Sequence, residues 1–276
     1  MTKSILITGC SSGIGFDAAH GLRARGWRVF ASCRKEDDCL RLRDEGFESP
    51  RIDYEDETSI TKGLAEALAA TGGTLDAVFN NGAYAIPGAV EDLPRGALRQ
   101  IFEANFFGVH DLTRQVIPVM RNQGHGRIIQ CSSVLGFAAL RYRGAYNATK
   151  FAMEGLTDTL RLEMHGTGIH ITLIEPGPIT TKIRKNSQKP FEKWVKWEES
   201  ARRHEYEKAF LPRLYDEAGT PDTFELPPST VTAKLIHALE SNRPKPRYYV
   251  TTPTYVMGIA KRLLPTRGLD WLARRA

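Results

Sequence analysis

The chain has 276 residues, of which 41% are hydrophobic and 25% are charged, and its formal net charge is +6. This composition excludes a disordered or low-complexity chain and is typical of a globular protein with a large core. The 4 cysteines form no CxxC pair and no zinc pattern, so we expect no metal site and a reducing compartment. The sequence has neither a signal peptide nor a run of about 18 apolar residues, so we expect a cytoplasmic protein without a transmembrane segment.

A glycine-rich turn follows the first apolar run. We predict a strand over 4–8, and apolar residues at helical spacing resume after the turn at Phe16, Ala19 and Leu22. Glycines between a strand and a helix let the backbone approach a pyrophosphate, and the helix N-terminus presents free N–H groups to it. The predicted dinucleotide-binding residues of this turn are Gly9, Ser11, Ser12, Gly13, Ile14 and Gly15.

The residues after the second predicted strand, 27–32, indicate which cofactor binds. An acidic residue at this place accepts hydrogen bonds from a ribose, whereas a basic residue accommodates a 2′-phosphate. The chain has Arg34 here and no acidic residue before Glu36, which favours NADP(H) over NAD. A short strand is predicted over 51–53, and Asp53 at its end is a candidate acceptor for the adenine amino group.

Two asparagines mark the next parts of the chain. The strand predicted over 75–79 ends before Asn81 and Gly82, where a glycine allows backbone to lie against a ligand. A single long helix is predicted over 98–120, and Asn105 lies in it among phenylalanines. Asparagine is an indifferent helix former, so we interpret Asn105 as a buried polar group that serves a site.

The segment 132–150 carries the candidate chemistry. Tyr146 and Lys150 are four residues apart on a predicted helix, so their side chains share one face. A nearby ammonium favours the phenolate, so we expect Lys150 to lower the pKa of Tyr146 and make it a proton donor and acceptor. Ser133, at the end of a predicted strand over 127–130, could hold the same substrate oxygen.

Strands and helices alternate along the chain, with further strands predicted over 169–174 and 248–250 and a helix over 231–239. This order predicts an α/β fold: a single Rossmann-type, doubly wound parallel sheet with helices on both faces. We interpret 1–276 as one domain. Ligands bind beyond the carboxyl ends of such strands, where all the residues above are expected to lie.

Two regions depart from the alternation. Residues 182–228 are rich in charge and in aromatic side chains, which favours a lid over an apolar substrate. Residues 251–276 form a basic C-terminal extension. For this extension we favour a cap on the fold or an oligomer interface over contact with a membrane surface.

Four motifs in this order resemble the short-chain dehydrogenase/reductase family. They are TGCSSGIG at 8–15, NNGA at 80–83, Ser133 with Tyr146 and Lys150, and PGPITT at 176–181. The family usually has NNAG at the second motif, so Gly82 and Ala83 are exchanged here. The similarity extends from about residue 4 to 181, and short matches are similar to NADP-preferring hydroxysteroid and retinol dehydrogenases and to a bacterial NADP-dependent aldehyde reductase.

The resemblance implies roles for individual residues. Asn105, Ser133, Tyr146 and Lys150 match a catalytic tetrad, in which Asn105 helps to anchor a water linked to the lysine. Tyr146 and Lys150 also lie at the nicotinamide ribose. The PGPITT motif adds four expected cofactor contacts, which are Pro176, Gly177, Ile179 and Thr181.

The expected function is hydride transfer between NADP(H) and a carbonyl or alcohol, on apolar aldehydes, ketones or steroid-like substrates. Two alternatives remain open: a reductase of a carrier-bound acyl or nucleotide-sugar intermediate, and a cofactor-sensing protein without turnover. We expect small-molecule substrates and no nucleic-acid partner. The resemblance also implies a homodimer or homotetramer.

Overall fold

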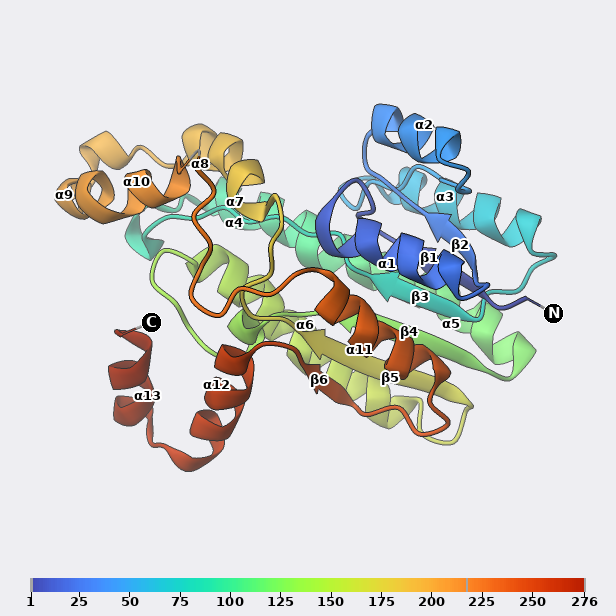
Figure 1. Ribbon diagram of the computed structural model, residues 1–276. Coiled ribbons are helices and arrows are strands. Elements are labelled where there is room, and N and C mark those ends of the chain that lie inside the picture. The colour runs from blue at the N-terminus through green and yellow to red at the C-terminus, as the bar shows by residue number, and fades with distance from the viewer. Residues whose placement is uncertain (1, 217, 276) are drawn as a thin grey trace.

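The computed structural model describes residues 2–216 and 218–275. At its centre lies an all-parallel sheet of six strands in the order β2-β1-β3-β4-β5-β6 (Figure 1). The strands are β1 (Ser4–Ile7), β2 (Arg28–Ala31), β3 (Ala77–Asn80), β4 (Gly126–Cys131), β5 (Ile169–Glu175) and β6 (Arg247–Tyr249). The chain leaves β1 toward β2 and then crosses back to β3, so the strand order reverses between β1 and β3. The predicted doubly wound α/β fold is confirmed.

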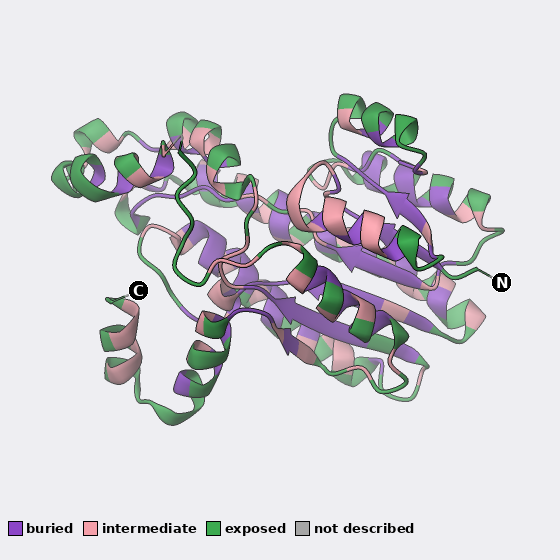
Figure 2. Cartoon of the chain, viewed as in Figure 1, coloured by how far each residue is buried: buried purple, intermediate pink, exposed green. Residues whose placement is uncertain are grey.

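Helices cover both faces of the sheet because neighbouring strand residues point to opposite sides. Ile5 and Ile7 of β1 pack into the cluster that contains α1 (Gly13–Ala24) and α11 (Ser229–Glu240). Leu6, between them, packs into the opposite cluster. The helices on that second side are α3 (Glu57–Ala70), α5 (Gly108–Gln123) and α6 (Gly144–Glu163). Figure 2 shows the result: buried strands between helices whose outer faces are exposed.

The strand predicted over 51–53 is wrong. This segment follows α2 (Glu36–Asp44) and meets β2 only through isolated parallel bridges, Phe30 to Glu48 and Cys33 to Arg51. Pro50 lies between the two bridges and has no N–H to donate, so a continuous ladder cannot form there.

The helix predicted over 98–120 is confirmed in extent, because the chain is helical without a break from Arg95 to Gln123, but it contains a π-helical turn that was not predicted. The structure has α4 (Arg95–Phe102), then a π-helical turn over Glu103–Phe107, then α5. Gly108 explains the close approach at the join, because a Cβ atom on it would overlap the backbone of Tyr54. Such π-turns within helices are frequent at functional sites, and this one contains Asn105.

The segment 182–228 folds as short helices at the carboxyl end of the sheet (Figure 1). They are α7 (Ile183–Asn186), α8 (Gln188–Trp194), a 3₁₀ turn (Trp197–Glu199), α9 (Arg203–Glu205), a π-turn (Tyr206–Phe210) and α10 (Leu211–Leu214). These short helices cover one side of the carboxyl end of the sheet, whereas α11 packs on the sheet itself.

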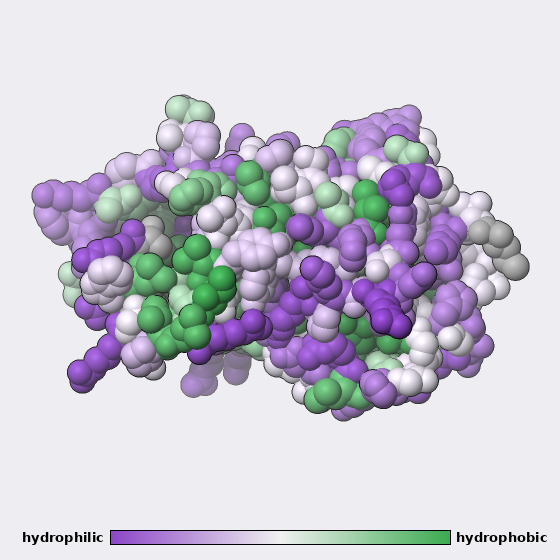
Figure 3. All heavy atoms as spheres, turned by 60° about the horizontal axis from the view of Figure 1, so that its bottom comes forward, coloured by the Kyte–Doolittle hydropathy of each residue, from purple (hydrophilic) through white to green (hydrophobic). Residues whose placement is uncertain are grey.

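The C-terminal extension forms two helices, α12 (Thr252–Leu263) and α13 (Thr266–Ala273), which project from the same end of the sheet. Gly258 packs α12 against Tyr249, but the other side of the helix keeps large apolar side chains exposed, and Figure 3 shows apolar atoms gathered on that part of the surface. They are Tyr255, Val256, Ile259, Leu263 and Leu264, joined by Trp271 of α13. None of the described helices combines the length and apolar character needed to cross a bilayer.

Candidate active site

The glycine turn after β1 is held in a shape that only small residues permit. Gly9 and Gly13 have φ angles of 71° and 62°, in the left-handed region. A Cβ atom on Gly15 would lie 2.5 Å from the carbonyl oxygen of Gly9, so the turn and the start of α1 pack backbone on backbone. Ile14 packs against the core below, which fixes the turn on the sheet.

The N-terminus of α1 is open to a ligand. Ser12 is the N-cap residue in an extended conformation, and its side chain makes no capping hydrogen bond within the described residues. The carbonyl of Ser11 accepts a hydrogen bond from Arg41 of α2, 2.9 Å away. First-turn N–H groups that have no side-chain cap are donors for an anion such as a pyrophosphate.

Polar side chains tie the glycine turn to the end of β3. Asn81 donates to the carbonyl oxygen of Thr8 at 2.9 Å, and the N–H of Gly82 donates to the Thr8 hydroxyl at 3.0 Å. That hydroxyl lies 2.8 Å from the hydroxyl of Tyr54, which donates to Asn80 at 2.7 Å. Asn81 therefore holds neighbouring strands together at the predicted site. Thr8 and Tyr54, which complete the network, were not predicted.

The region beyond β2 is basic, as predicted. Arg34 is exposed, and its guanidinium has no hydrogen bond or ion pair with any described residue. Its carbonyl oxygen accepts from Arg51 at 3.0 Å. A carboxylate oxygen of Asp53 lies 3.9 Å from the guanidinium of Arg51. Arg34 is thus available to a phosphate, whereas Asp53 already has a cation close by.

Lys150 is buried one helical turn beyond Tyr146 on α6. Its ammonium donates to the carbonyl oxygen of Cys131 at the end of β4, 2.7 Å away. The same nitrogen lies 5.6 Å from the centre of the Tyr146 ring. Burial lowers the pKa of Lys150. The predicted juxtaposition of the two side chains is therefore present in the structure.

The predicted lowering of the Tyr146 pKa is contradicted. Burial raises the pKa of this phenol. A hydrogen bond with Ser133 and the positive charge of Arg143 lower the pKa, but they do not offset burial. The phenol of Tyr146 is consequently held in its protonated form, and Arg143, which the sequence analysis did not single out, is a second cation that acts on it besides Lys150.

Ser133 is held at the end of β4 by the motif that follows β5. Its hydroxyl lies 3.4 Å from the carbonyl oxygen of Pro176 and accepts from the N–H of Leu135 at 3.1 Å. The carbonyl of Pro176 also accepts from the N–H of Val134 at 2.7 Å. These contacts fix the serine beside Tyr146, as the spacing of 13 residues predicted.

The rest of the PGPITT motif closes the site on two sides. A Cβ atom on Gly13 would lie 3.0 Å from the methyl group of Thr181, so this threonine touches the glycine turn. Ile179 forms an isolated parallel bridge with Leu226. Gly177 packs against Thr251 at the start of α12. The motif therefore connects the glycine turn to the segment 182–228 and to the C-terminal helices.

Asn105 is fully buried, as predicted, and among the described residues its side chain makes no direct hydrogen bond with Lys150. Its amide donates to the carbonyl oxygen of Tyr84 at 2.8 Å and accepts from the Tyr84 N–H at 3.1 Å. Its amide nitrogen also lies 3.3 Å from the hydroxyl of Thr149. The side chain thus fastens the segment after β3 to α6 and places the π-turn next to Lys150.

One apolar cluster joins Tyr146 to the segment 182–228. Tyr146 packs in it with Phe191, Tyr206 and Phe210, all from that segment, and with Ala85 and Ile86 after β3. The aromatic rings of Phe191, Tyr206 and Phe210 have centroids within 5.4–6.0 Å of one another. The phenol that would meet a substrate is therefore enclosed by apolar side chains.

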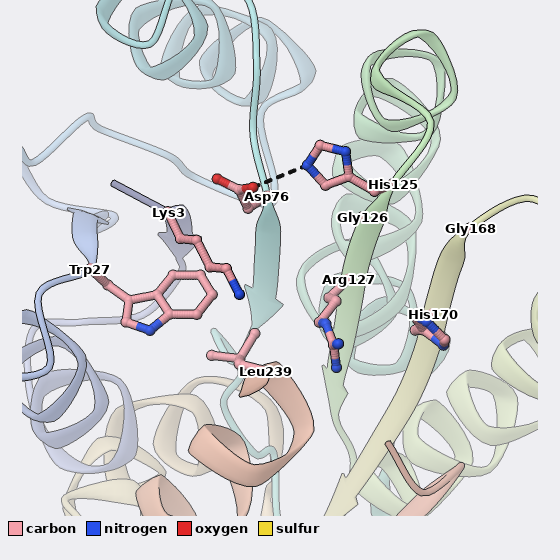
Figure 4. A pocket seen from close by; sticks show the side chains of 9 residues that line it. All are labelled: Lys3, Trp27, Asp76, His125, Gly126, Arg127, Gly168, His170 and Leu239. Atoms are coloured by element: carbon pink, nitrogen blue, oxygen red, sulfur yellow. Dashed lines mark hydrogen bonds and ion pairs between the residues drawn. The ribbon is translucent and has the colours of Figure 1, made fainter. Parts of the chain in front are cut away.

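A cavity lies at the opposite edge of the sheet, near the starts of β3, β4 and β5 (Figure 4). Its charged side chains already have partners. Asp76 accepts from the N–H of Ser4 at 2.7 Å and lies 3.1 Å from His125. Arg127 donates to the carbonyl oxygens of Ala238 and Ser241. These contacts bind β-strands and α11 together, and they give this cavity a structural role.

Comparison with known proteins agrees with this geometry. A family model described as short chain dehydrogenase matches residues 3–191. The uncharacterized oxidoreductase YbbO of Escherichia coli K12 is 39% identical over 275 residues, which is 98% of this chain and 93% of that protein. The NADPH-dependent 3-dehydrocapnine reductase of Ornithobacterium rhinotracheale is 30% identical over 278 residues, covering 96% and 94%.

A solved structure is similar over nearly the whole chain. The crystal structure of a short-chain dehydrogenase from Streptomyces avermitilis has a TM-score of 0.77 and 27% identity, and the match covers 93% of this chain and 90% of that one. The backbone-packed glycine turn, the open N-terminus of α1 and the unpaired Arg34 fit a nicotinamide dinucleotide at the carboxyl ends of the strands. With its Tyr146 and Lys150 on one helix and this likeness over its length, the chain belongs to the short-chain dehydrogenase/reductase family of oxidoreductases.

Proposed function

We propose that this oxidoreductase is an NADP(H)-dependent carbonyl reductase that acts on apolar aldehydes, ketones or steroid-like substrates. The observation that carries the proposal is the surroundings of Tyr146. The phenol lies beside Ser133 and Lys150 on one side and in an apolar cluster with Phe191 and Phe210 on the other. A proton donor between polar groups and an apolar wall suits a substrate with a carbonyl at one end of an apolar body.

The proposed roles follow from the contacts. When bound, a nicotinamide cofactor would supply the hydride for the carbonyl carbon. Tyr146 donates the proton to the carbonyl oxygen, and the burial that raises its pKa keeps that proton in place until the oxygen gains negative charge. Ser133 donates a hydrogen bond to the same oxygen. Lys150, anchored on the carbonyl of Cys131, binds the cofactor ribose and supports proton delivery.

The preference for NADP(H) rests on Arg34. This side chain is exposed and unpaired among the described residues, and Arg41 lies at the turn beside it. The relative from Ornithobacterium rhinotracheale is named as NADPH-dependent, which supports the same choice. We expect Arg34→Gln to raise KM for NADPH about tenfold or more, because a hydrogen bond to a charged group contributes about 1.5–3 kcal/mol. KM for NADH should remain the same. An equal change of KM for both cofactors would contradict a role of Arg34 in binding the 2′-phosphate of NADP(H).

The segment 182–228 is proposed as the lid that encloses the substrate, within a single domain. Its aromatic side chains already pack with Tyr146, and Ile179 is bridged to its last residues. A lid of this kind excludes water from the carbonyl and strengthens the polar contacts around it.

The test is NADPH oxidation with aliphatic aldehydes, aromatic ketones and steroid ketones. Tyr146→Phe should lower kcat/KM by about 10²–10⁴, since that is the usual contribution of a general acid. Tyr215→Phe is the matched control, because the hydroxyl of this half-exposed lid tyrosine bonds only Glu192 among the residues that the structure describes. Full activity of Tyr146→Phe would contradict the proposal. NADPH binding without turnover of any carbonyl would favour the cofactor-sensing alternative.

A carrier-bound acyl substrate is the second candidate, because Lys182, Lys185 and Lys189 of the segment 182–228 are exposed. Arg184, which the sequence suggested as a fourth member of this patch, instead pairs with Asp222 at 2.9 Å. Turnover of an acyl-carrier-bound ketone that far exceeds turnover of the free ketone would select this candidate.

A further inference from the structure

A strained loop immediately before α6 presents one arginine to the candidate site. Tyr142 has a φ angle of 60°, which a residue with a bulky side chain rarely adopts. The surrounding contacts hold it there. Its hydroxyl donates to Glu205 at 2.8 Å, and its ring lies 5.3 Å from Tyr206 and 5.0 Å from Phe210. Strain of this kind persists where the neighbourhood fixes it, often at ligand sites.

The residue that this loop delivers is Arg143. Its backbone is bridged to Gly88, and its guanidinium lies 6.0 Å from the ring centre of Phe210. It is close enough to Tyr146 for its charge to lower the pKa of the phenol. Arg143 is therefore placed between the lid aromatics and the group that would protonate the substrate.

Arg143 has no side-chain hydrogen bond or ion pair with any residue in 2–216 or 218–275, although it is half-buried. One carboxylate is near enough to act on its charge, that of Asp222. Asp222 is already bound by Arg184 and Arg213. The positive charges of Arg184 and Arg213 disfavour the charged form of Arg143. Both arginines also pair with Asp216. The guanidinium of Arg143 is thus partly desolvated, and the nearby carboxylate of Asp222 already pairs with other arginines.

A guanidinium in such a position matches the geometry of a carboxylate or phosphate group, to which it can donate two parallel hydrogen bonds. Resting on the proposed carbonyl reductase function, we propose that Arg143 binds an anionic group of the substrate, located a few bonds from the reacting carbonyl. The substrate class is then an amphipathic ketone or aldehyde. Its apolar chain lies against Phe191 and Phe210, and its anionic group pairs with Arg143.

The experiment compares matched ketones: 4-oxododecanoate, the phosphonate of the same length, and methyl 4-oxododecanoate. With NADPH as the cofactor, kcat/KM for the carboxylate or for the phosphonate, whichever is higher, should be at least tenfold above kcat/KM for the methyl ester. Arg143→Met should remove that preference, so that the anions and the ester are turned over with similar kcat/KM. Arg141→Met, an exposed neighbour, is the control and should keep the preference. Arg143→Lys should retain part of it. The stronger of the two anions identifies the group that the site takes.

A binding measurement keeps this inference separate from the proposed chemistry. Calorimetric titration of dodecanoate and of methyl dodecanoate into the protein with NADP⁺ should show the carboxylate binding at least tenfold tighter. Arg143→Met should abolish the difference while binding NADP⁺ with normal affinity. Equal binding of acid and ester, or a difference that persists in Arg143→Met, would overturn the inference. Absence of turnover with intact carboxylate binding would instead count against the proposed reductase function and support the anion site.

Discussion

The two sides of the candidate site are held together in different ways. The sheet edge is fixed by buried polar contacts: Asn81 on Thr8, Lys150 on Cys131, and Arg247 on the carboxylates of α6 and β5. The lid is fixed by aromatic packing of Phe191, Tyr206 and Phe210, with its charges at the rim. Directional polar contacts fix atoms that take part in chemistry, whereas aromatic packing tolerates changes of shape. We therefore expect the sheet edge to determine the reaction and the lid to determine the substrate.

The strongest test of the sheet edge is Arg247→Met. Arg247 of β6 pairs with Glu154 and with Glu175, which is fully buried, and it donates to Asp158 at 2.6 Å. Its removal leaves the buried carboxylate of Glu154 without a counter-charge and the carboxyl of Glu175 without its hydrogen-bond donor, so we expect a loss of about 3–5 kcal/mol in the free energy of unfolding. Urea titration measures it. Arg243→Met, at an exposed site without a side-chain partner among the described residues, should change stability by less than about 0.5 kcal/mol.

Gly15→Ala tests the backbone contacts of the glycine turn. The added Cβ atom would press on the carbonyl of Gly9 and on the amide of Asn81, which lies 2.7 Å away, and neither can move without disturbing β1 or β3. We expect a loss of about 1–3 kcal/mol in stability and weaker NADPH binding, measured by urea titration and fluorescence. Gly155→Ala, in an open part of α6, should stabilise the protein instead. Equal effects of the two substitutions would show that the turn is not tightly packed.

The lid should respond less strongly. The hydroxyl of Tyr206 donates to Asp92 at 2.8 Å and accepts from the N–H of Ala89 at 2.7 Å, both buried or partly buried contacts. Tyr206→Phe leaves the N–H of Ala89 unpaired and removes one of the two hydrogen bonds to the Asp92 carboxylate, which Ser200 still donates to, so we expect a loss of about 1–2 kcal/mol and a higher KM for apolar ketones, with kcat little changed. Tyr215→Phe should be neutral. If Tyr206→Phe lowers kcat and leaves KM unchanged, the lid also orders the catalytic groups.

The sequence predicted the sheet edge better than the lid for a physical reason. A parallel sheet brings every strand's carboxyl end to one edge, so Gly9, Asn81, Ser133 and Tyr146 meet whatever the details of packing. The π-turn at Asn105 is followed by the close approach of Gly108 to Tyr54, a residue distant in sequence. The raised pKa of Tyr146 depends on how deeply the lid buries it. Arg143 likewise acquires its role only through the conformation of Tyr142. Such properties arise from contacts between segments and leave no local pattern.

The sheet edge should also show a dependence of stability on pH. Burial raises the pKa of Glu175 to about 8, with the charge of Glu154 as the next cause, while Arg247 opposes the rise. A carboxyl whose pKa is higher in the folded state binds its proton more tightly there than in the unfolded chain. Its contribution is therefore complete below about pH 4.5 and is lost as the pH rises through about 8.

Between these values the free energy of unfolding should fall by no more than about 1.4 kcal/mol per pH unit from this group. Glu175→Gln should flatten that slope, because the amide does not titrate, whereas Glu163→Gln on the exposed end of α6 should leave it intact. Urea titrations from pH 5 to 8 measure the difference. An unchanged slope in Glu175→Gln would mean that Arg247 keeps Glu175 ionised throughout this range. The sheet edge would then be held by permanent buried charge, and its contrast with the lid, whose centre is packed by aromatic rings, would be greater than the pKa implies.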